Sequence, residues 1–332
     1  MINPRWVKYK DMGGPLYRGE KDGQKKVHVY DPDEPWGVWS QVLGVVARCE
    51  GTHDTVVMYD ETGVTAFFLQ WTFKSGRLQN LLQFMKGVPC DDGVSSVFDK
   101  HCVAEDGRQI FSGFGFRIDD GWFVTSAGKA LNPAKKRERD AIVDVCMGRR
   151  ALGTQKAQRR FAIDLCAMFA RLGQKKEVQD ATIDFAKVEF KRALRVKRAP
   201  LRDVGGRISS LLPGQVWGTP IPAIFFNLYQ NSPGGAFRLF KNAWKEAHKQ
   251  GIAFFVEGGD DAGYGLTSDD RYGDFLDLVW TRINRTKYAD WGFGSKQYIE
   301  SGGKNSPRIM RIKPAIKEFY DVDLPYDKRV ML

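Results

Sequence analysis

Glu50 is the residue whose type and setting best suit acid–base chemistry. It ends a stretch with helical spacing of apolar residues, and Gly51 follows it at once. Apolar and aromatic neighbours such as Trp39, Phe67 and Phe68 would disfavour the ionised form of a carboxyl group at the edge of a cleft. A carboxylic acid that keeps its proton near neutral pH can act as a general acid, for example toward a glycosidic oxygen.

The position of Glu50 also breaks a local rule. An acidic residue near the C-terminus of a helix faces the negative end of the helix dipole, which costs about 0.3 to 1 kcal/mol. Residues that break such rules are often functional. The competing interpretation is an ordinary surface glutamate near a helix end.

A helix and a β-hairpin are the elements that must position Glu50. Residues 36–50 predict a helix, because a capping aspartate and a proline precede them and apolar residues follow at helical spacing. Residues 54–73 are rich in Val, Thr, Tyr and Phe around the turn Asp-Glu-Thr-Gly at 60–63. This pattern predicts a β-hairpin or an irregular β-wing.

The segment around Glu50 resembles the catalytic core of the lysozyme-like superfamily, which includes phage lysozymes, goose-type lysozymes and lytic transglycosylases. Ala-Phe-Phe-Leu-Gln-Trp at 66–71 follows the helix-end glutamate and is similar to the Gly-Leu-Met-Gln motif of transglycosylases and goose-type enzymes. Phe67 or Phe68 stands where that motif has its glycine. The match covers about 35 of the 332 residues. The β-wing is similar to that of phage lysozymes through Tyr59, Asp60, Gly63 and Thr65.

The resemblance implies a glycosidase that cleaves the β-1,4 bond between N-acetylmuramic acid and N-acetylglucosamine in peptidoglycan. Glu50 would donate a proton to the leaving oxygen, and Asp60 or Thr65 would position the attacking water. A lysozyme yields a reducing end, whereas a lytic transglycosylase forms an anhydro ring with one acid/base glutamate. Both reactions stay open. Retention and inversion of the anomeric configuration stay open too, since retention needs two carboxyl groups about 5 to 5.5 Å apart and inversion needs them about 6.5 to 9.5 Å apart.

Aromatic and amide side chains near this segment are candidates for substrate binding. Aromatic rings can stack on the C–H faces of sugar rings, although core packing is the competing interpretation. Asp60 lies in a turn where aspartate often forms only local hydrogen bonds. The substrate-binding candidates are Tyr59, Phe68, Gln70 and Trp71, with Tyr229 and Asn231 on an opposite cleft wall.

The whole chain is expected to be α+β and mainly α, as a lysozyme-like fold with a small β-wing after the catalytic helix and additional helices. Helical patterns cover 76–87, 94–103 and much of 133–200, and two further helices begin at Pro220 and Pro233. We expect three segments, namely a lead-in arm at 1–35, the catalytic core at 36–125, and a helical region at 126–332 that completes the cleft and is a candidate for wall binding.

Composition favours a folded protein. Hydrophobic residues make up 42% of the chain and aromatics 13%, unlike a disordered sequence. The start has no apolar stretch typical of a signal peptide, and no run reaches the roughly 18 apolar residues of a membrane span. We therefore expect synthesis in a (host) cytoplasm and action at the bacterial cell wall, as for a phage endolysin or a virion-associated enzyme.

The cysteines and histidines do not predict a metal centre. The five cysteines are odd in number and widely spaced, and the four histidines are scattered without a metal-ligand spacing. Neither a disulfide framework nor a zinc site is indicated. We expect no cofactor and no metal.

The formal net charge of +11 predicts a polyanionic partner. Peptidoglycan with its associated anionic polymers is one, and nucleic acid is another. Acidic residues interleaved through the basic helical region 133–202 dilute its positive field, which makes nucleic acid the less favoured partner. A monomer is favoured. Two alternatives stay open, a non-catalytic glycan-binding or tail-associated structural protein and a basic nucleic-acid-binding protein.

Overall fold

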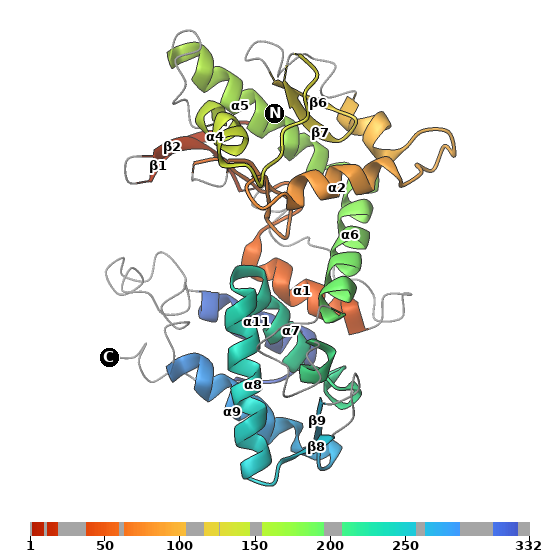
Figure 1. The fold of residues 1–332 in the computed structure, drawn as a ribbon, viewed down its shortest axis with the longest axis vertical. Coiled ribbons are helices and arrows are strands. Elements are labelled where there is room, and N and C mark those ends of the chain that lie inside the picture. The colour runs from red at the N-terminus through yellow and green to blue at the C-terminus, as the bar shows by residue number, and fades with distance from the viewer. Residues whose placement is uncertain are drawn as a thin grey trace. The chain divides into compact units, whose positions relative to one another are not determined.

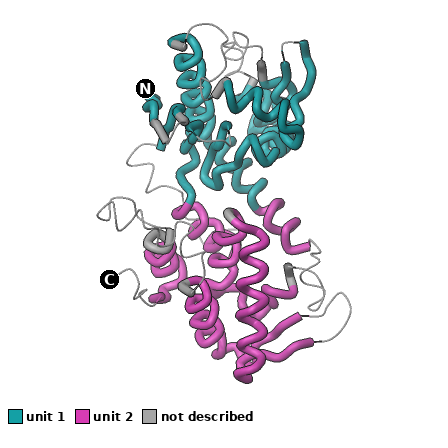
Figure 2. Tube along the Cα trace, turned by 60° about the vertical axis from the view of Figure 1, so that its left-hand side comes forward, with its two compact units in different colours: residues 1–27, 50–186 teal, residues 28–49, 187–332 magenta. Residues whose placement is uncertain are grey.

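The computed structural model divides the chain into two compact units. Unit 1 comprises residues 1–27 and 50–186, and unit 2 comprises residues 28–49 and 187–332 (Figure 2). Each unit is therefore assembled from two separate stretches of sequence. The structure describes residues 2–9, 12–18, 38–59, 63–103, 116–125, 127–146, 155–195, 208–256, 263–285 and 308–324.

Unit 1 contains a five-stranded antiparallel sheet whose strands follow one another in sequence order (Figure 1). The expected β-wing supplies the last three strands of this sheet. The segment expected to be a lead-in arm supplies the first two strands. The strands are β1 (Arg5–Tyr9), β2 (Met12–Tyr17), β3 (Val56–Val57), β4 (Thr65–Ala66) and β5 (Trp71–Thr72).

A close backbone contact joins the N-terminal hairpin to the wing. β2 pairs with β3, and the backbone amide of Met58 donates to the carbonyl oxygen of Pro15 (3.0 Å). Gly14 lies beside this bond, and a Cβ atom added there would lie 2.0 Å from the Met58 carbonyl oxygen. The strands can therefore approach this closely only because residue 14 has no side chain.

Helices and a two-stranded antiparallel sheet make up the rest of the described part of unit 1. The expected helix at 76–87 is confirmed, and the region at 133–200 is helical through most of its described residues. At 94–103 the helix is shorter than expected, because only Phe98–Val103 is helical, with π geometry. The further elements are α2 (Arg77–Lys86), η2 (Phe98–Val103), β6 (Phe116–Asp119), β7 (Trp122–Thr125), α4 (Lys136–Cys146), α5 (Gln155–Gly173) and α6 (Lys176–Leu194), which continues into unit 2.

Aromatic rings fill the core of unit 1 between the sheet and the helices. The ring of Phe67 lies 6.4 Å from that of Trp71 and 6.2 Å from that of Phe169. Trp71 also contacts Phe185 of α6, with 5.8 Å between ring centroids. All four side chains are buried, so the wing is held by hydrophobic contacts as well as by strand pairing.

The described part of unit 2 is mostly helical, with one pair of antiparallel strands. The start of α7 is as predicted, since the hydroxyl of Thr219 accepts a hydrogen bond from the amide of Ile221 (3.3 Å) and Pro220 follows as the first helical residue. The elements are α1 (Val38–Glu50, its last residue in unit 1), η5 (Ile208–Leu211), η6 (Gly214–Val216), α7 (Pro220–Asn231), α8 (Pro233–Lys249), β8 (Ala253–Val256), β9 (Gly263–Leu266), η8 (Asp269–Arg271), α9 (Tyr272–Arg285) and α11 (Arg308–Tyr320).

Within unit 2, α1 packs against α11 near the end of the chain. A Cβ atom added at Gly44 would lie 2.4 Å from the ring of Phe319, so the helix backbone and this ring are in direct contact. The side-chain amide of Gln41 donates to the carbonyl oxygen of Phe319 (3.0 Å). Arg48 forms an ion pair with Glu318 (2.6 Å). The helix that leads to Glu50 is therefore fixed by residues far downstream.

The architecture confirms an α+β chain that is mainly helical with small antiparallel sheets. Among the described residues, no helix combines the length and the hydropathy that crossing a bilayer requires.

We predict that Gly14→Ala destabilises the protein by about 1 to 3 kcal/mol, because the added methyl group forces the backbones of β2 and β3 apart. Gly234→Ala is the matched control. Apart from its chain neighbours and the backbone of its own helix, no described residue has an atom within 4 Å of a Cβ atom added at Gly234 in the first turn of α8, so this change should be neutral or slightly stabilising. Denaturant unfolding measures both changes. Equal denaturant midpoints for the two variants would contradict the close contact between Gly14 and the backbone of Met58.

Candidate functional site

Glu50 is the last residue of α1 and is half-buried. The helix buries an apolar face that includes Val42, Val45 and Val46. Burial of this face fixes the orientation of the helix within unit 2. Trp39, expected as a neighbour of the carboxyl group, instead packs within unit 2, with its ring 5.0 Å from that of Trp217. Packing within unit 2 therefore accounts for the position of Trp39.

A compact loop follows Glu50 and is held by its own hydrogen bonds. The amide of Thr52 donates to the hydroxyl oxygen of Thr55 (2.9 Å), and the amide of Thr55 donates back to the carbonyl oxygen of Thr52 (3.0 Å). A Cβ atom at Gly51 would lie 3.0 Å from the Thr55 side chain. The glycine predicted as a helix end is thus also needed for the loop to fold back on itself.

The end of α5 anchors this loop from outside. A Cβ atom at Gly173 would lie 2.1 Å from the carbonyl oxygen of His53, so the two backbones touch. The side-chain amide of Gln174 donates to a carboxylate oxygen of Asp54 (3.1 Å), and the hydroxyl of Thr52 donates to the other (2.7 Å). The buried carboxylate of Asp54 is thus hydrogen-bonded on both oxygens, as a buried charge requires, and holds the loop in place.

The second half of the matched segment lies directly against this loop. The backbone amide of Phe67 donates to the carbonyl oxygen of Thr55 (2.9 Å). The backbone amide and the side-chain amide of Gln70 both donate to the carbonyl oxygen of Phe67 (3.0 and 2.8 Å). Residues 67–70 therefore form a tight turn that is bonded to the loop after Glu50.

This turn has a rare backbone conformation. Phe67 has a φ angle of 66° and Gln70 has one of 52°, in the left-handed region that costs a residue with a side chain roughly 1 to 2 kcal/mol. Such conformations are concentrated at functional sites. Of the two phenylalanines that could stand for the motif's glycine, Phe67 has the conformation that glycine favours.

The structure places the other candidates of unit 1 in different surroundings. Thr65 is buried in β4, whereas Tyr59 and Gln70 are half-buried. Phe68 and Trp71 are 1% and 0% exposed, and their rings meet edge to face at 5.3 Å. Neither ring presents a face on which a sugar could stack, so burial favours the packing interpretation for both. Asp60 lies outside the described residues.

Tyr229 and Asn231 belong to unit 2, on α7. The ring of Tyr229 stacks on that of Phe225 (6.0 Å, 20°) and meets that of Phe237 (5.9 Å), so packing within unit 2 accounts for its position. Asn231 ends α7, and its side chain lies outside the described part of the structure.

Sequence reasoning did not identify the residues that fix the loop after Glu50. Thr52, Asp54 and Thr55 lie in the run Gly-Thr-His-Asp-Thr, whose composition is typical of a turn, so a local signal was present. Gly173 and Gln174 gave none, because Gln174 meets Asp54 across 120 positions of sequence.

Comparison with known proteins adds no relative. No protein-family model, no curated protein and no solved structure matches the chain. The function must therefore be argued from the residues and their geometry.

We predict that Phe67→Gly is more stable than Phe67→Ala by about 1 kcal/mol, because glycine adopts a positive φ angle without strain. Both variants lose the same buried ring, so their difference reports the backbone alone. Phe73 provides the matched control, since it is also fully buried but has no positive φ angle, and there alanine should be the more stable by about 0.5 to 1 kcal/mol. Denaturant unfolding of the four variants measures this. The same order at both positions would exclude the left-handed conformation of Phe67.

Proposed function

We propose that the protein is a peptidoglycan glycosidase with a lysozyme-like fold, which cleaves the β-1,4 bond between N-acetylmuramic acid and N-acetylglucosamine. The observation that carries this proposal is the hydrogen bond between Phe67 and Thr55. It joins the loop after Glu50 to the turn that resembles the Gly-Leu-Met-Gln motif, so the two halves of the resemblance meet in space. Sequence similarity alone did not require this contact.

Glu50 is the general acid in this proposal. It lies where a helix ends and a sheet begins, half-buried, so its carboxyl group can reach a bound glycan while keeping part of its surface away from water. It protonates the glycosidic oxygen as the bond breaks. General acid catalysis by such a group accounts for about 10²- to 10⁴-fold in rate.

The remaining candidates divide by their burial. Gln70 holds its own turn through Phe67, and Thr65 supports the sheet at β4, so both position the site. Tyr59, two residues after β3 and half-buried, is the aromatic candidate of the wing for contact with sugar. Asp60 follows it and is the candidate that orients a water molecule, while a transglycosylase would use the substrate's own hydroxyl instead.

The bacterial cell wall is the proposed site of action. A net charge of +11 favours association with the anionic polymers that accompany peptidoglycan. An enzyme synthesised in a host cytoplasm would reach this substrate through a holin lesion, or as part of an injected particle. We propose that it acts as a monomer.

We predict that Glu50→Gln lowers the release of muropeptides from purified peptidoglycan by about 10²- to 10⁴-fold, because the amide cannot donate the proton. Mass spectrometry of the products identifies the reaction. Reducing ends that also disappear in Asp60→Asn indicate a lysozyme with two carboxylates. Anhydro products that persist in Asp60→Asn indicate a transglycosylase.

Asp164→Asn is the control for loss of one carboxylate. The side chain of Asp164 is 53% exposed and lies 3.9 Å from that of Arg160. Because such a surface ion pair contributes little to stability, this variant should release muropeptides as the wild type does. If the wild type releases nothing from swollen sacculi, or if Glu50→Gln is as active as the wild type, the glycosidase proposal is wrong. Cosedimentation of both proteins with sacculi in that case would identify a non-catalytic glycan-binding protein.

A further inference from the structure

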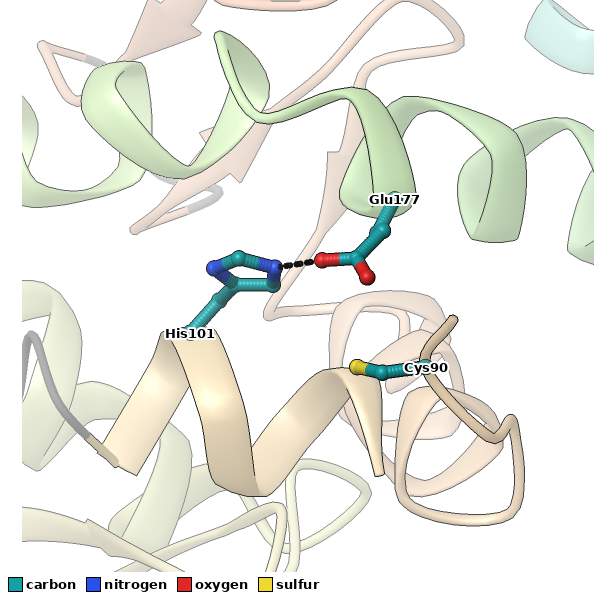
Figure 3. Close-up of side chains that lie close together, drawn as sticks. All are labelled: Cys90, His101 and Glu177. Atoms are coloured by element: carbon teal, nitrogen blue, oxygen red, sulfur yellow. Dashed lines mark hydrogen bonds and ion pairs between the residues drawn. The ribbon is translucent and has the colours of Figure 1, made fainter. Parts of the chain in front are cut away.

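Three side chains of unit 1 that could bind a metal ion lie close together. They come from segments of the sequence other than the loop after Glu50. They are Cys90, His101 and Glu177 (Figure 3). Cys90 follows α2, in a loop closed by its own amide donating to the carbonyl oxygen of Ser95 (2.8 Å). His101 lies in the π-helix η2, and Glu177 is the second residue of α6. π-helical turns occur frequently at functional sites.

The three side chains meet at one point. One ligand atom from each lies within 4.8 Å of the other two. Nε2 of His101 and a carboxylate oxygen of Glu177 are 2.5 Å apart. The thiol of Cys90 is buried, and the side chains of His101 and Glu177 are only 14% and 18% exposed. A sulfur, a nitrogen and an oxygen atom thus lie close together on side chains that are little exposed to solvent.

The arrangement does not suit a cysteine nucleophile. A catalytic Cys–His–carboxylate relay needs one imidazole nitrogen on the thiol and the other on the carboxylate. Figure 3 shows instead that the Nε2 edge of His101 is the one turned toward Glu177 and Cys90, while Nδ1 lies on the far side of the ring. Donors that converge on one point are what a metal ion requires.

We propose that Cys90, His101 and Glu177 form a zinc-binding site. Zn²⁺ accepts thiolate, imidazole and carboxylate ligands at about 2.0 to 2.3 Å, in a tetrahedron whose ligand atoms are roughly 3.3 to 3.8 Å apart. The 2.5 Å between the imidazole nitrogen and the carboxylate oxygen is shorter than this, so these two groups need to part by about 1 Å to admit the ion. The thiol loses its proton to solvent on binding.

Neighbouring groups hydrogen-bond to the carboxylate and orient it, as groups around the ligands of metal sites do. Lys100 donates to the other oxygen of Glu177 (2.9 Å), and the backbone amide of Asp91 donates to the same oxygen (3.3 Å). The hydrogen bonds from His101 and then Lys100 lower the pKa of Glu177 to about 2, so this ligand is ionised at neutral pH. Asp92 lies 3.6 Å from Lys100 and offsets its charge.

Bound zinc would tie together the loop after α2, the π-helix and the start of α6. Three protein ligands leave a fourth position for water, as in zinc sites that are not closed by protein. Zinc binding here does not depend on whether Glu50 is catalytic. The ligands escape sequence analysis because Glu177 follows His101 by 76 positions.

The test is metal binding by the full-length, untagged protein. After equilibration with Zn²⁺ and gel filtration, elemental analysis should find one zinc per chain in the wild type. Co²⁺ should bind in its place with a near-ultraviolet thiolate-to-metal absorption band. Cys90→Ser should lose this band together with stoichiometric zinc, and Glu177→Gln, which preserves the shape of the side chain, should lose stoichiometric zinc.

Cys102→Ala is the matched control. Cys102 is also buried and is adjacent to His101 in the same π-helix, yet it is not among the converging ligands, so this variant should keep the zinc and the cobalt band. Zinc should also raise the thermal midpoint of the wild type and of Cys102→Ala but not of Cys90→Ser. Absence of stoichiometric zinc from the wild type, or zinc retained in both ligand variants, would overturn the site.

Discussion

The hydrogen bond from the amide of Phe67 to the carbonyl oxygen of Thr55 is the contact on which the candidate site depends. It connects the loop that leaves Glu50 to the turn that ends at Gln70. Each partner is itself constrained, the loop by its paired threonines and by α5, and the turn by Gln70. The backbone bond between Phe67 and Thr55, together with these side-chain hydrogen bonds, therefore holds the loop after Glu50 against the turn.

The strained turn is stabilised by burial. Two residues with side chains adopt positive φ angles there, and each costs roughly 1 to 2 kcal/mol. The fully buried rings of Phe67 and Trp71 offset this cost, because burial of a large apolar side chain contributes roughly 1.5 to 3 kcal/mol. This explains why a phenylalanine can occupy a position whose backbone favours glycine. These buried aromatic residues thus act from the core, by fixing the turn that is bonded to the loop after Glu50.

Local patterns were sufficient to predict the helix that ends at Glu50, the wing, and the helix that starts at Pro220, since caps, glycines and apolar spacing lie within a few residues of the elements they define. Pairing across long sequence separations was not predictable. Nothing in residues 5–17 indicates that they join a sheet with residues 56–72, because strand partners are chosen by tertiary packing. The contact of Gly173 with His53 and the convergence of Cys90, His101 and Glu177 were not predictable either, because they also join distant parts of the sequence. Burial of Phe68 and Trp71 could not be read from their types, since aromatic residues serve both cores and binding surfaces.

The packing of α1 against α11 has a consequence for how the protein is made. The partners of α1, Glu318 and Phe319, follow it by about 270 positions, and ribosomes add roughly 5 to 20 residues per second. The contacts of α1 with Glu318 and Phe319 therefore form only on the order of tens of seconds after the helix has been synthesised. Apolar surface that stays exposed during synthesis is what chaperones bind. Chains released early would carry every residue of the proposed catalytic segment while lacking the support that holds its helix in place.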